Sequence, residues 1–539
     1  MIQPSLRTDA PMFLYALACK PATGPQQVEP PALVAIDVEP DLVELSTGLE
    51  VPEVVQYVAT GEYEDGEIAA LDTVEWSLSN RSVGTLDSFG LFTPSPDNGG
   101  FSYVTARLAG IEGDSEIILT WLDERDEEGI DHTLFDSSVV TEQEFWLYPE
   151  DGVNFPRNTP SIRFMWSDLG ATAYRLRLRS QVTDLSVYTT STSWTADVAT
   201  WQQIVATNAG GSVEVELEAS LAGTVVAAPV RSLSVNRMDA EGSIVYWTTT
   251  GSGLMEIPYG GEASEYLTAN QTGRCVGCHV ISANEHIAFT YDGGNGPLGV
   301  KNVGDLSDIE ASNTVYGNFK AYSPDGEWLV TTLAGALLLY DGVTAEYLGD
   351  VPLSSPVTMP TWSPNDDQIF VVTTAGHEYD WSFSGGRLGV IDVYGDGTFS
   401  DVVEVYAPPE GNVCYPEYSP DGRWIAFNRS TQDCYDDSDA TVYVMRATGG
   451  DPIALDAANQ TVNLTNSWPR WGPLPDDDVL WLTFSSRRAY GDVVSGQPQI
   501  WVAGFDPERA LEGEDPSWPA FWLPGQATSD NNHIPVWAP

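Results

Sequence analysis

Residues 321–332, AYSPDGEWLVTT, decide the fold, because their pattern returns three more times in the second half of the chain. The other copies are MPTWSPNDDQIFVVTT at 359–374, YPEYSPDGRWIAFNRS at 415–430 and WPRWGPLPDDDVLWLTFSS at 468–486. Each copy places an aromatic residue before a Ser-Pro or Gly-Pro turn rich in aspartate, and an apolar strand follows the turn. An internal repeat of this kind has to be recognised before any fold is assigned.

The spacing of the repeat indicates one small four-stranded sheet per copy. Successive aromatic anchors lie 40, 56 and 53 residues apart, at Tyr322, Trp362, Tyr418 and Trp471. The S-P-D-G pattern resembles the TolB-like β-propeller family, and the resemblance covers about the last 300 residues. It implies a ring of blades around a central channel.

Two further copies complete the expected ring. HVISANEHIAFT (279–290) fits the same frame with Ile281 as its anchor, and the chain ends in HIPVWAP with an anchor at Trp537 but no blade after it. The continuation lies upstream, in MDAEGSIVYWTTTGSGLMEIPYG (238–260). We therefore predict a six-bladed propeller over residues 238–539, closed by a clasp in which the C-terminal strand completes the blade begun near residue 238.

The rest of the chain also reads as β structure, so the predicted fold class is all-β, with two N-terminal β-sandwich domains before the propeller. Residues 33–122 alternate short strands and turns, and their order of a tyrosine-rich strand, a D-G turn, Trp76, Gly90 and a closing V-T-A strand is similar to bacterial group 2 immunoglobulin-like domains. Residues 140–236 are similar to fibronectin type III domains, with Trp166 in the core. Both resemblances imply spacer or adhesion modules.

The motif that carries chemistry is Cys275-Val276-Gly277-Cys278-His279. C-x-x-C-H is the spacing at which two thiols capture both vinyl groups of a haem while the next imidazole reaches the iron. The alternatives are a redox C-x-x-C and part of a zinc site, but no second Cys pair or H-x-x-x-H lies nearby. The motif predicts one covalent haem c, with Cys275 and Cys278 as its anchors and His279 as the proximal ligand.

The repeat also suggests where a distal ligand lies. Residues just before each anchor should ring the central channel, and we expect this ring to hold His279, Phe319, Met359, Tyr415, Trp468 and, one step earlier, His533. Only Met359 and His533 offer a second iron ligand. We favour Met359 as the distal ligand, because Met/His ligation is common in c-type electron carriers, with His533 as the alternative.

The remaining cysteines indicate an exported protein. Cys414 and Cys434 flank one short hairpin-like segment and are expected to form a disulfide. Cys19 follows a short apolar run and precedes a proline-rich tether, so residues 1–32 resemble a lipoprotein leader in which Cys19 is the lipidation candidate; the alternative is an unusual ordinary signal peptide. No other apolar run approaches the ~18 residues of a membrane span. We expect the periplasm, the outer membrane or the cell surface as its location, with a lipid anchor as the only membrane contact.

The charge of the chain limits its partners. Its 539 residues carry a formal net charge of -55, and lysine occurs only at positions 20, 301 and 320. Without basic patches to neutralise phosphates, nucleic-acid binding is excluded as a function. An acidic surface of this kind would steer a basic redox partner, or it reflects adaptation to salt.

Two smaller features are open to more than one interpretation. The loop with Asp436, Asp437 and Asp439 could hold Ca2+ or be a solvated acidic loop. Arg487 and Arg488 could pair with the haem propionates or form structural ion pairs.

The sequence thus predicts an exported, surface-tethered monohaem c-type cytochrome that transfers one electron to or from a redox partner protein. Two other functions stay open. The propeller could be a binding or adhesion platform for a surface protein or glycan, with haem as a structural cross-link. A haem with an open distal position could instead be a peroxidase-like enzyme, although no H-x-x-R or similar pairing accompanies the motif.

Overall fold

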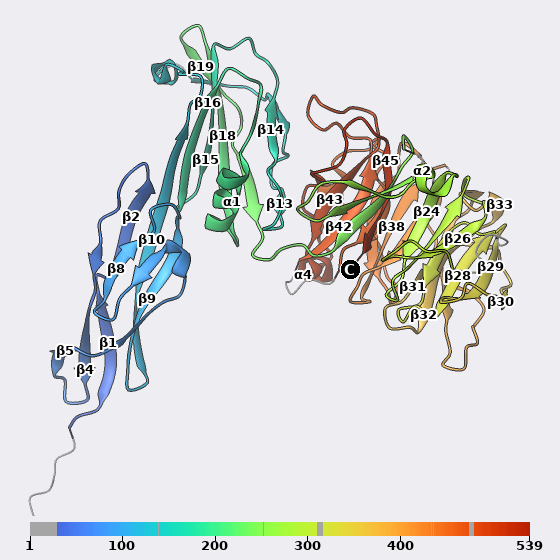
Figure 1. The fold of residues 1–539 in the computed structure, drawn as a ribbon, viewed down its shortest axis with the longest axis horizontal. Coiled ribbons are helices and arrows are strands. Elements are labelled where there is room, and N and C mark those ends of the chain that lie inside the picture. The colour runs from blue at the N-terminus through green and yellow to red at the C-terminus, as the bar shows by residue number, and fades with distance from the viewer. Residues whose placement is uncertain are drawn as a thin grey trace, which may run out of the picture.

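The computed structural model describes residues 30–137, 140–251, 253–309, 316–432, 434, 436–473 and 479–538, so the lipidation candidate Cys19 lies outside the described residues. The described chain is nearly all β, as predicted. Figure 1 shows two β modules at the N-terminal end, drawn in blue to green, and a propeller-like body that holds the rest of the chain. No helix within the described ranges is long and apolar enough to cross a membrane.

The first module is a set of short strands packed around one apolar core. Its elements are β1 (Leu33–Glu39), β2 (Leu42–Gly48), β3 (Val55–Gln56), β4 (Val58–Tyr63), β5 (Ile68–Ala70), β6 (Glu75–Leu78), the 3-10 turn η1 (Arg81–Val83), β7 (Gly84–Leu86), β8 (Leu91–Pro94), β9 (Gly100–Leu108) and β10 (Ile111–Arg125). Buried and exposed side chains alternate along β9, because one face of the strand meets the core. Val83, Phe92, Val104 and Ile117 are completely buried there.

The second module continues directly from the first. Its elements are η2 (His132–Phe135), β11 (Val140–Glu142), β12 (Trp146–Tyr148), β13 (Asn154–Phe155), β14 (Arg163–Trp166), β15 (Ala173–Arg179), β16 (Thr183–Thr189), β17 (Ser193–Thr195), α1 (Val198–Thr207), β18 (Gly211–Leu221), β19 (Thr224–Ala227) and β20 (Arg231–Val235). Residues 121–125 of β10 pair in parallel with residues 183–187 of β16. The long strand β10 therefore crosses the predicted boundary at residue 122 and joins both modules through one sheet (Figure 1).

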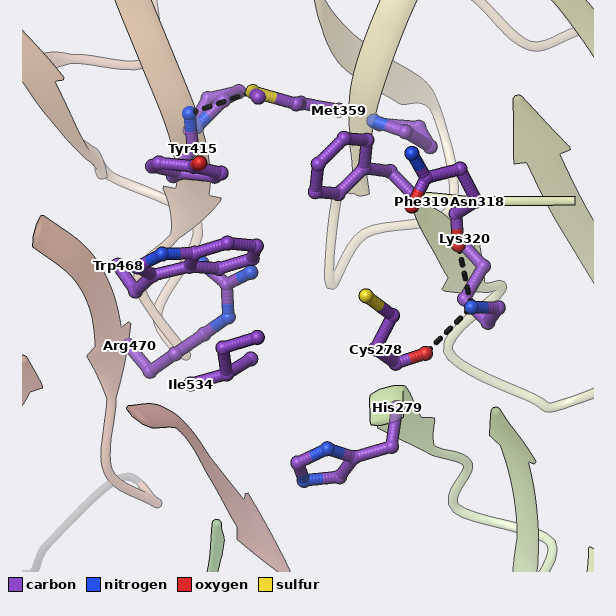
Figure 2. A pocket seen from close by; sticks show the side chains of 12 residues that line it. Cys278, His279, Asn318, Phe319, Lys320, Met359, Tyr415, Trp468, Arg470 and Ile534 are labelled. Atoms are coloured by element: carbon purple, nitrogen blue, oxygen red, sulfur yellow. Dashed lines mark hydrogen bonds between the residues drawn. The ribbon is translucent and has the colours of Figure 1, made fainter. Parts of the chain in front are cut away.

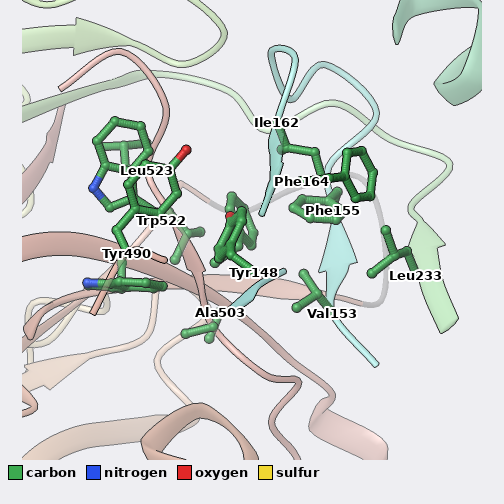
Figure 3. Packing of buried hydrophobic residues seen from close by; sticks show 14 of the residues in the cluster. Tyr148, Val153, Phe155, Ile162, Phe164, Leu233, Tyr490, Ala503, Trp522 and Leu523 are labelled. Carbon is green, nitrogen blue, oxygen red and sulfur yellow. The ribbon is translucent and has the colours of Figure 1, made fainter. Parts of the chain in front are cut away.

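The second module also packs against the body that follows it. Tyr148 contacts Tyr490 with ring centroids 4.9 Å apart, and Phe155 contacts Phe521 at 4.8 Å. Figure 3 shows Tyr148 and Phe155 of the second module packed beside Tyr490 of the body. The contact belongs to one continuous apolar cluster, which ties the second module to the last sheets of the body.

The body consists of small antiparallel sheets that follow one another along the chain. Its strands are β21 (Ser243–Thr248), β22 (Gly253–Pro258), β23 (Ser264–Leu267), β24 (Val276–Ile281), β25 (His286–Tyr291), β26 (Leu298–Asn302), β27 (Lys320–Tyr322), β28 (Trp328–Leu333), β29 (Ala336–Asp341), β30 (Tyr347–Asp350), β31 (Val357–Trp362), β32 (Gln368–Thr373), β33 (Gly376–Tyr379), β34 (Ser382–Ser384), β35 (Arg387–Asp392), β36 (Val403–Tyr406), β37 (Asn412–Tyr418), β38 (Trp424–Ser430), β39 (Thr441–Arg446), β40 (Ile453–Ala454), β41 (Ser467–Trp471), β42 (Leu480–Ser486), β43 (Gln499–Phe505), β44 (Phe521–Trp522) and β45 (Asn532–Ala538). Short helices α2 (Ala269–Thr272), α3 (Asp456–Asn459) and α4 (Pro507–Glu512) lie between strands.

The strand pairing gives the body its propeller-like form. The sheets are β23-β22-β21-β45, β24-β25-β26, β27-β28-β29-β30, β31-β32-β35-β36, β37-β38-β39-β40 and β41-β42-β43-β44, and a ribbon β33-β34 is inserted in the fourth. Each repeat copy supplies the first strands of one sheet, as its aromatic anchor and turn predict. Strand β45 pairs antiparallel with β21, so the predicted clasp between the C-terminal strand and the segment after residue 238 is confirmed.

Candidate functional site

Five sheets of the body share an irregularity in one strand that faces the centre. In β24, β31, β37, β41 and β45, the pairing with the next strand skips two residues. The skipped pairs are Cys278-His279, Met359-Pro360, Tyr415-Pro416, Trp468-Pro469 and Ile534-Pro535. The first residue of every pair has a positive φ, with values of 44°, 51°, 52°, 60° and 52° in that order.

These pairs are β-bulges, and they explain why proline recurs in them. A bulged residue is released from the ladder, so a proline without an N–H costs no hydrogen bond there. The bulge also changes the direction of the side chain before the proline, which no longer follows the alternation of side chains between the two faces of the strand. The C-x-x-C-H motif places Cys278 and His279 where four other sheets hold X-Pro.

The channel ring differs from the expected one by one residue at two places. The positions equivalent to Met359, Tyr415 and Trp468 hold Cys278 and Ile534; the expected His279 lines the cavity as well, whereas His533 is not among its lining residues. Phe319, Met359, Tyr415 and Trp468 do line the channel, as expected. Phe319, Met359, Tyr415 and Trp468 lie three positions before their anchors, whereas the expectation took a residue two positions before Ile281 and one four positions before Trp537.

The ring residues enclose a cavity of about 30 Å3. Figure 2 shows Cys278 and Lys320 on one side of it, with Tyr415 and Trp468 on the other. Tyr415 and Trp468 are stacked, with ring centroids 3.7 Å apart. The lining residues are Cys278, His279, Asn318, Phe319, Lys320, Met359, Pro360, Tyr415, Pro416, Trp468, Arg470 and Ile534.

His279 is held as a neutral imidazole with one nitrogen bonded and the other not. The side chain is 5% exposed, and its Nε2 lies 3.1 Å from the carbonyl oxygen of Val245. Because a carbonyl only accepts, Nε2 carries the proton, and Nδ1 keeps a lone pair that is buried without a hydrogen-bond partner in the described protein. Burial lowers the pKa of His279 to about 3, although its bond to Val245 opposes the shift, so the ring stays neutral in any ordinary buffer.

The two cysteines of the motif are thiols of intermediate exposure. Burial raises the pKa of the Cys278 thiol, while the nearby Lys320 ammonium opposes the shift. Arg274, next to Cys275, forms an ion pair of 2.7 Å with Asp292 and stacks over the ring of Tyr291. The backbone N–H of Asp292 also donates to the carbonyl oxygen of Cys275, which fixes the start of the motif.

The structure places the two candidate distal ligands differently. Met359 is 2% exposed and lines the same cavity as Cys278 and His279, and its sulfur accepts a hydrogen bond of 3.2 Å from the Tyr415 N–H. His533 is also buried, but it is not among the residues that line this cavity. Burial lowers the pKa of His533 to about 4.

The predicted disulfide between Cys414 and Cys434 is present, with its Cα atoms 5.8 Å apart. Cys414 directly precedes the bulged Tyr415 on β37. Cys434 and Cys414 belong to the same apolar cluster as Met359 and Trp468. The bridge therefore anchors the wall of the cavity to the segment that follows β38.

The three aspartates of the acidic loop are each engaged by other parts of the protein. Asp436 forms an ion pair with Arg487, Asp437 accepts from Ser430, and Asp439 accepts from Thr431. Within the described ranges, no group of three or more His, Cys, Asp or Glu side chains is arranged to hold a metal ion.

The two neighbouring arginines have structural partners. Besides the ion pair of Arg487, the buried Arg488 donates to the carbonyl oxygen of Ala458 and to the side chain of Asn466. Burial lowers the pKa of Arg488 to about 9. Neither arginine lines the cavity.

Lys320 is the cavity residue that sequence reasoning missed. Its Nζ donates hydrogen bonds of 2.5 Å to the carbonyl oxygens of Cys278 and Asn318, and so links β27 to the neighbouring β24. Burial lowers the pKa of Lys320 to about 8, so the amine is still mostly protonated at neutral pH. The signal was available in the sequence, since Lys320 occupies the position that proline takes in the repeats around Trp362, Tyr418 and Trp471.

No protein-family model and no curated protein matches the chain. Among solved structures, it is similar to TolB from Acinetobacter baumannii, with 13% identity and a TM-score of 0.40, over 61% of this chain and 79% of that one. It is also similar to a quinoprotein alcohol dehydrogenase-like protein from Bacteroides thetaiotaomicron, with 9% identity and a TM-score of 0.33, over 73% of this chain and 99% of that one. Both scores are low, so the fold is taken from the strand pairing alone.

Proposed function

We propose that this chain is an exported monohaem c-type cytochrome that transfers single electrons. One haem is attached through thioether bonds at Cys275 and Cys278, and its iron is bound by His279. The observation that carries the proposal is the state of His279, which is buried, neutral, and bonded through one ring nitrogen while the other keeps its lone pair. Metal-ligating histidines almost always donate their second ring N–H to a carbonyl or carboxylate, which is the role that Val245 would have.

The donor set fits a haem in its chemistry. Two thiols, a neutral imidazole and the thioether of Met359 lie at or beside one cavity. The cavity itself, of about 30 Å3, is far below the roughly 300–1,000 Å3 of pockets that enclose whole ligands. A haem bound to these donors would therefore need more space than this cavity gives as it stands.

When bound, the haem supplies a one-electron iron couple, and the protein sets its potential through ligands, burial and hydrogen bonds. Val245 would fix the orientation of the His279 ring by accepting a hydrogen bond from its Nε2–H. The stacked Tyr415 and Trp468 would exclude water from the channel side of the site. Met359 remains our preferred distal ligand, because it shares the cavity with His279, and His533 remains the alternative.

The finer architecture belongs to the same proposal. We infer a six-bladed, TolB-like propeller behind an immunoglobulin-like and a fibronectin III-like module, which would act as spacers. The buried disulfide Cys414–Cys434 supports export, because such bonds persist in oxidising compartments. A lipid anchor at Cys19 would tether the protein, and its acidic surface would favour a basic redox partner.

The test is to produce the full chain with and without a c-type haem maturation system. We expect one covalent haem by mass, a c-type pyridine haemochrome spectrum, and loss of both in Cys275→Ala/Cys278→Ala. Production that yields no covalent haem, although the maturation system loads a control cytochrome, would overturn the proposal.

The distal ligand is decided by two further variants. In the ferric protein, methionine ligation gives a characteristic near-infrared band, and we expect Met359→Leu to abolish it while His533→Asn leaves it unchanged. A low-spin spectrum without this band that becomes high-spin in His533→Asn would assign His533 instead. A high-spin spectrum in the parent would favour a peroxidase-like enzyme.

A further inference from the structure

The lining of the central cavity has a charge opposite to that of the molecule. The chain has 78 acidic and 23 basic residues. The residues that line the cavity nevertheless include Lys320 and Arg470 and not one aspartate or glutamate. The cavity is therefore a positively charged site in a strongly negatively charged protein, and such a site favours anions as ligands.

Of the two cations, Lys320 has the charge that is more available to a ligand. It is 8% exposed and forms no ion pair with a carboxylate in the described part of the chain, in contrast to Lys301, which pairs with Asp308 at 2.8 Å. Two of its three N–H groups donate to the carbonyl oxygens of Cys278 and Asn318. A third donor remains, on a buried charge that has no counter-ion.

Asn318 supplies a second, independent sign of a missing partner. Its side chain is 1% exposed and lines the cavity, and neither its Oδ1 nor its Nδ2 has a hydrogen-bond partner in the described protein. A buried amide without partners is rare in folded proteins and calls for a ligand or a water. Figure 2 shows Asn318 beside Lys320, on the same wall of the cavity.

Arg470 faces the cavity from the opposite side. Its guanidinium donates to the carbonyl oxygen of Pro469 and lies 3.6 Å from the carboxylate of Glu417, so its charge is only partly available. The volume of about 30 Å3 exceeds the roughly 10–15 Å3 that holds one water molecule. A monoatomic anion or the end of a carboxylate group fits such a volume.

We propose that Lys320 and Asn318, with Arg470 opposite, form an anion-binding subsite in the central channel. Lys320 and the Asn318 Nδ2 donate to the anion. Its occupant is either a free small anion or a carboxylate of the haem, and this second source rests on the proposed function. In the second case, Lys320 and Arg470 would pair with a haem propionate, which is the role that the sequence suggested for Arg487 and Arg488.

The experiment uses bromide as the probe and the full chain produced without the haem maturation system. We expect crystals soaked in bromide to show an anomalous peak within hydrogen-bond distance of Lys320 Nζ and Asn318 Nδ2. In solution, bromide should stabilise the protein against unfolding. Lys320→Met should weaken its affinity by roughly ten- to hundredfold, the effect of losing one charge-assisted hydrogen bond.

Matched variants separate this effect from a general loss of stability. Lys301→Met removes an equally buried lysine that has its own carboxylate, and it should leave bromide affinity unchanged. Asn318→Asp keeps the shape of the side chain but puts a carboxylate in the subsite, so it should abolish binding. No peak in the parent, or a peak retained in Asn318→Asp, would overturn the proposal.

The haem-loaded protein distinguishes the two occupants. A bromide peak in the haem-free chain that disappears on haem loading assigns the subsite to a haem carboxylate, whereas a peak in both forms assigns it to a free anion. If the chain takes up no haem at all, the proposed function fails, while the haem-free crystals still decide the anion subsite.

Discussion

Replacing His279 by proline should be tolerated by the fold and should remove one acid-sensitive group. Four other bulges already hold proline at this place, after a residue with positive φ, and Cys278 has the same backbone geometry. The backbone is therefore suited to proline, and no ladder hydrogen bond is lost. The variant does lose the imidazole and its bond to Val245, a cost that does not depend on pH.

The pH-dependent part follows from the lowered pKa of His279. In the haem-free folded chain this pKa is about 3, against 6.5 in the unfolded chain. Between these values the unfolded chain binds a proton that the folded chain does not, so stability is complete above pH 6.5 and is lost as pH falls toward 3. Integrated from about pH 7 to about pH 5, this group lowers the free energy of unfolding by about 2 kcal/mol.

The assay is urea unfolding of the haem-free parent and of His279→Pro at these two pH values. His533, with a pKa lowered to about 4, contributes a similar acid loss in both proteins and therefore cancels in the comparison. We expect the parent to lose about 2 kcal/mol more than the variant between pH 7 and 5. Equal losses in the two proteins would refute the burial of a neutral His279, and failure of the variant to fold would refute the equivalence of the bulges.

Three further outcomes are expected. Replacing Cys414 and Cys434 by alanine should lower the free energy of unfolding by about 3 kcal/mol, because the bond closes a loop of 20 residues, and urea unfolding that shows no loss would contradict this. Between about pH 7.5 and 9.5 the haem-free parent should gain about 2 kcal/mol more than Lys320→Met, since Lys320 has a folded pKa of about 8 against 10.5 unfolded, while the buried Arg488 contributes equally to both; equal gains in the same assay would contradict this. Trp537→Ala should cost about 3 kcal/mol by opening the clasp, where the indole donates to Thr483, and a thermal midpoint equal to that of the parent would show that the ring closes without it.

The repeat predicted the sheets of the body well, because it combines a local turn signal with an apolar strand in each copy. The position of the site within a strand was predicted less well. The motifs M-P-T-W, Y-P-E-Y, W-P-R-W and I-P-V-W share one frame. C-H-V-I fits the same frame, in which Cys278 aligns with Met359. The sequence analysis missed this frame at two anchors, because it took the residue two positions before Ile281 and the residue four positions before Trp537 instead of the third.

Other secondary-structure elements and their pairing could not be predicted from the local sequence pattern. Strand β10 joins the two N-terminal modules through parallel pairing with β16, which is a non-local contact without a sequence signature. Helix α1 is rich in valine, threonine and isoleucine, which favour strands, and tertiary packing of Trp201 and Ile204 overrides that preference. The N-cap Asp197, whose carboxylate accepts from the Thr200 N–H, was its one local signal.

The bulged strand explains how the C-x-x-C-H motif can be accommodated in a repeat of this kind. Each bulge directs one side chain into the channel and frees the next residue from the ladder, so both positions accept new chemistry without loss of strand pairing. In one sheet these positions hold Cys278 and His279, and in another the same step supplies Met359. Two iron ligands would thus need residue substitutions only at equivalent bulges. For this reason we propose Met359 as the distal ligand rather than His533, because His533 lies just before a bulge. Lys320 also stands at the proline position of its own repeat and lines the cavity, although its strand pairs without a bulge.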